Sequence, residues 1–309
     1  MVNLALSWQQ SAAGAAVLAA CAWGLLRASH AADGRPRRAG RLAAGAGFVR
    51  ETALVLALFG LWQFAGSFAV MGTGGAMGRA RWLWDAERVL RLPSEAALQR
   101  IILPHPLIVQ AFDWYYDILH FPVLIGCLIW LFVRHRERYG EFRITLVAFT
   151  AICLLIQLIP VAPPRMLPGI GMVDTATVYG QSVYATGFDA DQLSAMPSVH
   201  VGWAILIAIA VIGAIRSRWR WLAVAYPVLT TIAVTVTANH FWLDGIAAAA
   251  ILGVVLAAQA AASRLLGPSR PAEETGIGTW HGRTCDGIQA LHALDRRQAL
   301  DRSGSKPPG

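Results

Sequence analysis

The sequence predicts an all-α fold, a polytopic transmembrane bundle of about seven spans, from its composition and its apolar runs. The chain is 56% hydrophobic and only 14% charged, with a mean hydropathy of +0.50, whereas a soluble domain carries about 25% charged residues. Apolar runs that approach the roughly 20 residues needed to cross a bilayer recur along the chain. They indicate one membrane domain, although 309 residues would allow one to three soluble domains.

Seven apolar runs are long enough to be spans, and polar segments separate them. They occupy residues 8–26, 52–71, 114–133, 144–161, 198–215, 221–238 and 245–262. The last six form the core of the predicted bundle, within residues 50–262. Residues 1–49 add an N-terminal transmembrane helix and a basic cytoplasmic loop, and residues 263–309 form a tail rich in Pro, Gly and mixed charge. Such a composition predicts disorder.

Arginine placement predicts how the spans are oriented. Six arginines fall in residues 27–50, four in 134–143 and three in 216–220, and basic residues concentrate in cytoplasmic loops. If the seven spans alternate, all three segments lie inside, with the N-terminus outside and the tail in the cytoplasm. We therefore expect a multi-pass protein of the plasma membrane. This topology accounts for the net charge of +8, so we expect no nucleic-acid partner.

Two long segments are expected outside the membrane. Residues 72–112 open with glycines and then mix Trp and Leu with Arg, and Ser94 is placed to cap a helix that begins at Glu95. This pattern is typical of an interfacial amphipathic segment, and it also fits a lid or a surface that collects anionic lipids. The Gly- and Thr-rich residues 169–194 are expected to cover the site.

Three polar motifs stand at the outer ends of spans: APPRM (162–166), AMPSVHVGW (195–203) and NHFWLD (239–244). An ionisable residue within a membrane span is costly and usually functional. The predicted topology brings all three motifs to the outer side. We therefore expect one active site on the extracytoplasmic face.

The residue types in these motifs predict acid–base or nucleophilic chemistry on an anion. His240 and Asp244 are four residues apart and share a helix face, so the carboxylate can fix the imidazole tautomer and free the other nitrogen to attack or to take a proton. His200 provides a second imidazole that can act as an acid. Ser198 can donate its hydroxyl beside the amides of a helix start. Arg165 is a fixed cation suited to phosphate.

With these motifs the chain resembles the type 2 phosphatidic acid phosphatase superfamily of lipid phosphatases and phosphotransferases, over about residues 50–262. AMPSVHVGW is similar to a PSGH-type motif, and NHFWLD to an H-x-x-x-D motif. The resemblance implies that His240 forms a phosphohistidine, that Asp244 orients it, and that His200 protonates the leaving group. It also implies that Arg165 and Ser198 hold phosphate oxygens, and that no metal or other cofactor is needed.

Two departures from the phosphatase pattern indicate a branch within this superfamily. Leu158 stands where the phosphatases have a lysine, and Val234 where they have an arginine. The bacterial branch related to inositol phosphorylceramide synthases shares these departures. We therefore expect transfer of a phosphorylated, phosphoinositol-like headgroup from a phospholipid to a lipid alcohol. The alternative is a phosphatase of lipid phosphates or prenyl pyrophosphates.

A further polar cluster lies outside the motifs. Asp113, Asp117 and His120 fall at i, i+4 and i+7 at the outer end of the third span. They are either interfacial residues that face water or a polar wall that recognises hydroxyls of a headgroup or acceptor.

Two rival functions use the same residues. A transporter would place ionisable groups near the membrane midplane, on broken helices in repeated halves, whereas here they gather at one face. A zinc hydrolase would use His200, His240 and Asp244 as ligands. Treatment with a chelator separates this enzyme from a metal-free one.

Overall fold

The computed structural model describes residues 7–32, 36–69, 75–180 and 192–265. Within these ranges the regular structure is helical, apart from one isolated bridge between Val161 and Ser194. The helices long and apolar enough to cross a membrane are Trp8–His30, Arg37–Leu61, Pro106–Arg134, Arg136–Gln157, Arg218–Val236 and Trp242–Leu265. Together with the shorter apolar helix Val199–Ala214, they confirm the predicted polytopic helical bundle.

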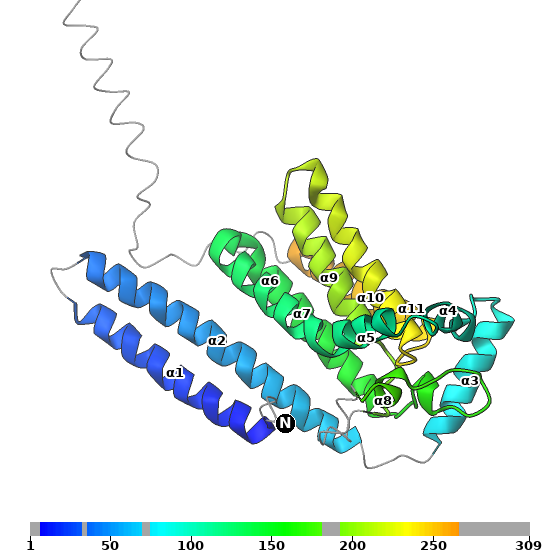
Figure 1. Cartoon of the computed structure of the whole chain (residues 1–309). Helices are drawn as coiled ribbons and strands as arrows, with labels where there is room; N and C mark the ends of the chain where they lie inside the picture. Colours follow the sequence, from blue (N-terminus) through cyan, green and yellow to red (C-terminus); the bar gives the residue numbers. More distant parts are fainter. Residues whose placement is uncertain (1–6, 33–35, 70–74, 181–191, 266–309) are drawn as a thin grey trace, which may run out of the picture.

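The first two helices form a long hairpin at one side of the bundle (Figure 1). Helix α1 (Trp8–His30) packs along α2 (Pro36–Ala69). Gly60 permits this approach, because a Cβ there would lie 3.0 Å from the Cβ of Ser11. The basic loop expected at 27–50 is mostly helix, since its Ala and Arg residues are good helix formers and Pro36 suits a helix start.

The hairpin joins the bundle through α7 (Arg136–Gln157). The carboxylate of Glu51 on α2 forms an ion pair with Arg143, and it accepts a hydrogen bond from Tyr139 Oη at 3.2 Å. A buried charge needs such partners. Because α6 (His120–Arg134) ends two residues before α7 begins, the basic segment expected at 134–143 is also largely helical.

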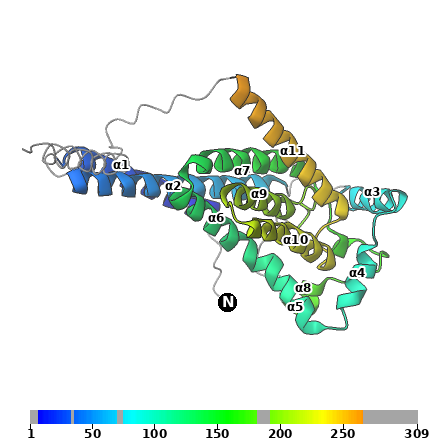
Figure 2. The same cartoon turned by 90° about the horizontal axis from the view of Figure 1, so that it is seen from above.

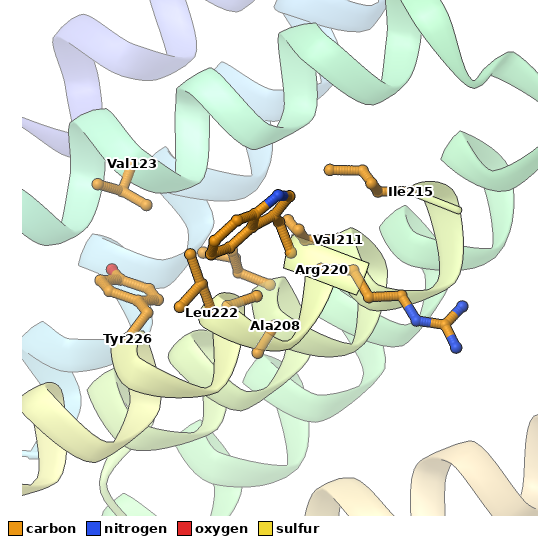
Figure 3. Close-up of a pocket in the computed structure, with 10 residues that line it drawn as sticks. Val123, Ala208, Val211, Ile215, Arg220, Leu222 and Tyr226 are labelled. Atoms are coloured by element: carbon orange, nitrogen blue, oxygen red, sulfur yellow. The ribbon is translucent and has the colours of Figure 1, made fainter. Parts of the chain in front are cut away.

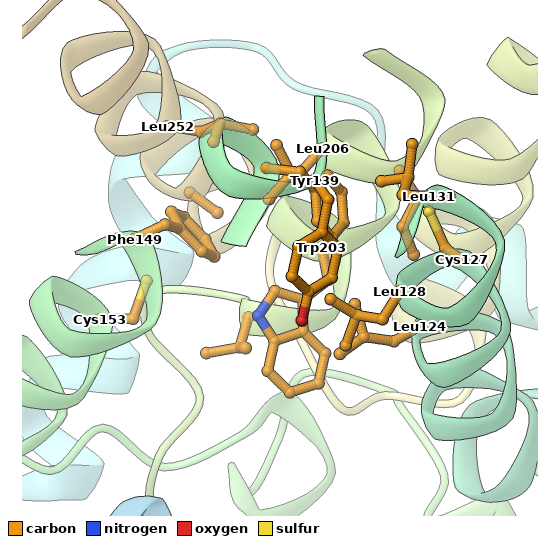
Figure 4. Packing of buried hydrophobic residues seen from close by; sticks show 14 of the residues in the cluster. Leu124, Cys127, Leu128, Leu131, Tyr139, Phe149, Cys153, Trp203, Leu206 and Leu252 are labelled. Atoms are coloured by element: carbon orange, nitrogen blue, oxygen red, sulfur yellow. The ribbon is translucent and has the colours of Figure 1, made fainter. Parts of the chain in front are cut away.

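The core lies between α6, α7, α9 (Val199–Ala214) and α11 (Trp242–Leu265) (Figure 4). Its side chains are large and apolar, and Phe149 and Leu131 are fully buried. Gly202 on α9 faces the Phe149 ring so closely that a Cβ at this position would overlap the ring. The backbone of α9 is thereby held against α7 two residues beyond His200.

The outer segment folds as three short helices over one end of the bundle (Figure 2). These are α3 (Ala76–Val89), α4 (Glu95–Ile102) and α5 (Pro106–Trp114), which continues through the π-helix Tyr115–Leu119 into α6. The predicted cap is confirmed, because Ser94 Oγ accepts a hydrogen bond from the Ala97 amide at 3.3 Å. The small side chains of α3 pack against the segments that carry the three motifs.

The remaining elements are short. They are the 3₁₀ turns Pro164–Met166 and Arg218–Val224, α8 (Thr175–Val178), and α10 (Ala225–Val236). The expected tail beyond Leu265 lies outside the described residues, as do residues 181–191 of the segment expected to cover the site.

Candidate active site

The three motifs meet at the end of the bundle where α7 ends and where α9 and α11 begin. The Arg165 amide donates to the Ala238 carbonyl oxygen at 3.0 Å, which ties APPRM to the turn before His240. The Ser198 amide donates to the Asp244 carbonyl oxygen at 3.1 Å, which ties the start of α9 to the start of α11. The sequence motifs therefore form one hydrogen-bonded unit.

His240 follows a sharp turn at the end of α10. Ala238 adopts a left-handed backbone (φ 57°), an uncommon conformation for a residue with a side chain, and the His240 amide donates to the Val234 carbonyl oxygen at 3.1 Å. His240 Nδ1 then lies 2.7 Å from the Ala195 carbonyl oxygen and 3.4 Å from Asp244 Oδ2. Because both neighbours are acceptors, Nδ1 carries the proton, and Nε2 keeps the lone pair that a nucleophile needs.

The Asp244 carboxylate contacts both the imidazole of His240 and the backbone next to it. Its side chain is fully buried, and Oδ2 also accepts a hydrogen bond from the Phe241 amide at 2.8 Å. The carboxylate is thus fixed in a desolvated position beside the imidazole. There its charge favours the positive form that the ring adopts on bonding to an electrophile.

His200 stands in the first turn of α9, next to His240. The two imidazole centroids are 5.8 Å apart, and the Tyr116 ring lies 4.6 Å from His200 and 6.4 Å from His240. The two histidines that the sequence singles out are therefore close enough to act on one substrate group. Tyr116 forms a third side of this cluster.

Arg165 brings a cation to the same place. Its side chain is only 5% exposed, its guanidinium donates to Asn239 Oδ1, and its Nε lies 3.8 Å from Asp174 Oδ2. The Asp117 carboxylate also lies within electrostatic range of this guanidinium. The positive charge is therefore held beside the backbone of His240 and is partly balanced by two acids.

Ser198 is the N-cap of α9. Its side chain is buried, and its Oγ accepts a hydrogen bond from the Val201 amide at 3.4 Å. This bond satisfies one of the unpaired amides of a helix start. Its contact with phosphate oxygens stays a prediction.

The three residues of the predicted polar wall differ in burial and in hydrogen-bond partners. Asp113 is buried and accepts a hydrogen bond from Thr175 Oγ1 at 2.8 Å, whereas Asp117 is partly exposed. The π-helix Tyr115–Leu119 lies between Asp113 and His120 and inserts an extra residue into the turn. The i, i+4 and i+7 positions share one face only in a regular α-helix. The π-helix therefore changes which of these residues lie on the same face.

His120 lies behind His200. Its Nε2 is 3.1 Å from the His200 carbonyl oxygen, and its Nδ1 is 3.1 Å from Tyr226 Oη. Both ring nitrogens are thus engaged within the protein, and the ring centroid lies 4.7 Å from that of His200. Sequence reasoning did not find the roles of Tyr226 and Asn239, because α10 and the turn after it meet these partners only in the folded bundle.

A cavity of about 440 Å³ lies beside the second half of α9 (Figure 3), and neither His200 nor His240 lines it. Its lining is mainly apolar and includes Val123, Ala208 and Tyr226. Its lining also includes Arg220, and the hydroxyl of Tyr226 lies 3.1 Å from His120 Nδ1. Among the described residues, no group of three or more His, Cys, Asp or Glu side chains is placed where it could hold a metal ion.

Comparison with known protein families shows which superfamily the chain belongs to. A family profile described as the PAP2 superfamily matches residues 81–258, a range that begins on α3, includes all three motifs and covers more than half of the chain. No curated protein and no solved structure matches the chain. From the profile match, the chain belongs to the PAP2 superfamily.

Proposed function

We propose that this protein is an integral-membrane lipid phosphotransferase that moves a phosphorylated headgroup from a phospholipid to a lipid alcohol. Membership of the PAP2 superfamily and the membrane-spanning helices support a lipid phosphatase or phosphotransferase. The observation that carries the proposal is the position of His240 Nδ1 between two acceptors, which leaves Nε2 as a nucleophile. The site would act on the extracytoplasmic face of the plasma membrane.

The first step forms a bond between His240 Nε2 and phosphorus. The bond from phosphorus to the diacylglycerol oxygen of the donor phospholipid breaks, its electron pair leaves with that oxygen, and protonated His200 supplies the proton that makes diacylglycerol. Asp244 stabilises the positive charge of the phosphorylated ring. In the second step the acceptor hydroxyl attacks phosphorus and gives its proton to His200, while the electron pair of the P–N bond returns to His240.

The charge of the site favours a phosphodiester over a phosphate monoester. A monoester carries roughly −1.5 to −2 charge near neutral pH, and a diester carries one negative charge. Arg165 is faced by Asp174 and Asp117, and Leu158 and Val234 occupy the positions at which the phosphatases have cations. Phosphatidylinositol therefore fits the site as a donor, and the resemblance to the inositol phosphorylceramide synthase branch agrees with this choice.

The headgroup and acceptor hydroxyls need partners near the histidines. Asp117 is partly exposed and lies close to Arg165, so its carboxylate can accept hydrogen bonds from a polyol. Asp113 and His120 are bound within the protein and would support this wall from behind. Asp117 is therefore the residue of the three that we propose for headgroup recognition.

A phosphatase of lipid phosphates or prenyl pyrophosphates is the second candidate. It is favoured by the position of α3, which brings two further cations to the APPRM segment. Arg79 Nε donates to the Pro160 carbonyl oxygen at 2.6 Å, and an Arg81 guanidinium nitrogen donates to the Pro168 carbonyl oxygen at 2.6 Å. These charges flank the loop that carries Arg165 and would help to hold a dianion.

A side-by-side assay separates the two functions. Purified full-length protein is given phosphatidate, a prenyl pyrophosphate, or phosphatidylinositol with ceramide as the lipid alcohol. His240→Ala serves as the inactive control. Formation of the phosphoinositol ester of ceramide supports the phosphotransferase. Rapid release of inorganic phosphate from the first two substrates, with no headgroup transfer, would establish the phosphatase instead.

A further inference from the structure

The first turn of α11 lacks a cap of its own. The residue before the helix is Phe241, which has no side-chain oxygen, and the Asp244 carboxylate is bound to the Phe241 amide and to His240. The first amides of a helix have no partner within the helix and need an acceptor from elsewhere. The Leu243 amide finds one in Glu87 Oε1 on α3, at 2.8 Å.

Two further contacts bind the same turn to the outer segment. Trp242 Nε1 donates to the Pro93 carbonyl oxygen at 2.8 Å, and the Phe241 side chain is buried in a cluster with Ala76, Ala80 and Leu83 of α3. Figures 1 and 2 show the start of α11 beside α3 and α4. All three residues between His240 and Asp244 are thus held by α3 or by the turn that follows it.

Glu87 sits in a small buried group of acids with one cation. Its side chain and that of Glu95 on α4 are fully buried, and an Arg88 guanidinium nitrogen lies 2.8 Å from Glu95 and 3.8 Å from Glu87. The Glu95 and Asp244 carboxyls are the acids that act electrostatically on Glu87. Burial, and then the Glu95 carboxyl, raise the pKa of Glu87 to about 9. Glu87 is therefore neutral at pH 7.

We propose that Glu87 is a positioning residue of the reaction, whose side-chain oxygen caps α11 and thereby fixes the geometry between His240 and Asp244. The inference rests on the proposed function for its activity readout. If Glu87 has this role, helix α3 is a part of the active site. A small displacement of a catalytic group can cost about 100-fold in rate, so the position of this turn matters for turnover.

Two substitutions separate the acceptor from the charge. Glu87→Gln keeps an oxygen for the Leu243 amide and can donate to Glu95, whereas Glu87→Leu keeps most of the volume and removes the acceptor. With phosphatidylinositol and ceramide, we expect Glu87→Gln to stay within about threefold of the wild-type kcat. We expect Glu87→Leu to lose about 100-fold in kcat with little change in KM. Glu51→Leu, which removes a buried carboxyl on α2, is the matched control and should keep its kcat.

Hydrogen exchange tests the same inference without turnover. The backbone amides of residues 241–245 should exchange roughly tenfold faster in Glu87→Leu than in Glu87→Gln. Wild-type kcat in Glu87→Leu would overturn the inference, as would a loss in Glu87→Gln equal to that in Glu87→Leu. If Glu87→Leu does not fold, Glu87→Gln decides: wild-type turnover and exchange support the neutral cap, and loss of either overturns it.

The two proposals fail in different ways. If His240→Ala turns over normally, the proposed function is wrong, and the exchange data still decide the role of Glu87. If His240→Ala is inactive while Glu87→Leu is normal, only the inference about Glu87 is wrong.

Discussion

The Nδ1 atom of His240 lies 2.7 Å from the carbonyl oxygen of Ala195, the first residue of the motif that carries His200. Asp244 Oδ2 lies further from the same nitrogen, at 3.4 Å. The backbone of one motif therefore fixes the tautomer of the histidine in another, with the carboxylate as a second acceptor. This bond joins the two histidine motifs, in addition to the bond between the Ser198 amide and the Asp244 carbonyl oxygen.

The backbone acceptor predicts a moderate effect for Asp244→Asn. When a catalytic histidine depends on one aspartate for its tautomer, the same change costs about 10⁴ in kcat. Here the Ala195 carbonyl still selects the Nδ1–H tautomer, and only the carboxylate charge is lost. We expect kcat to fall about 100-fold. Steady-state assays with the preferred lipid measure this change. A loss as large as that of His240→Ala would show that Asp244 fixes the tautomer itself.

Gly202→Ala should displace His200 by changing the packing of α9 against α7. The added Cβ would overlap the buried Phe149 ring, so α9 must move away from α7, and His200 would move with it. Overpacking of this kind typically costs about 1–3 kcal/mol. We expect a lower melting temperature and reduced turnover. Gly253→Ala on α11, where an added Cβ meets no atom within 4 Å, is the control. Equal melting temperatures for the two variants would contradict the packing described here.

The acid pair on α3 and α4 predicts a pH-dependent stability. The pKa of Glu87 rises from 4.5 to about 9 in the folded protein. An unfolded chain loses this proton near pH 4.5, and the folded protein keeps it to about pH 9. The contribution of Glu87 to stability is therefore fully present below pH 4.5 and is lost as pH rises toward 9.

Glu87→Gln removes this titration and should become more stable relative to the wild type as pH rises from 5 to 9. Thermal unfolding of both proteins across this range measures the difference. Glu95 on α4, Arg88 on α3 and Asp244 on α11 face the same group and are unchanged in the variant. A difference in melting temperature that stays constant with pH would show that Glu87 is ionised in the folded protein.

The arginine distribution predicts the topology. Reporter fusions at Arg37, in the first half of α2, and at Gly180, just after α8, should give opposite sides of the membrane, with Arg37 inside. The proposed extracytoplasmic site requires Gly180 to lie outside. Fusions that report the same side would remove the basis for placing the site there.

Much of the fold was predictable because it depends on local composition. Apolar runs identified the spans, and polar motifs at their ends identified His200, His240, Asp244 and Arg165, which the structure brings together. The first part of α2 was predicted as a loop, because a high density of arginines is found both in loops and on exposed helix surfaces.

Other features depend on contacts that no local pattern records. The π-helix at Tyr115–Leu119 changes which face His120 occupies. Glu87 is an acid in an amphipathic segment, and its bond to the Leu243 amide crosses from α3 to α11. Ala195 acts through its carbonyl oxygen, which every residue possesses. Such partners become visible only when the helices are assembled.

The most direct test of the account is whether phosphate becomes attached to His240. Purified protein is incubated with ³²P-labelled phosphatidylinositol, phosphatidate or prenyl pyrophosphate, quenched in alkali, in which a phosphohistidine survives, and digested for mass spectrometry. We expect a label on the peptide that contains His240 with at least one of these lipids, and no label in His240→Ala. A fully active protein that carries no label at His240, or a folded His240→Ala protein that turns over normally, would contradict the account.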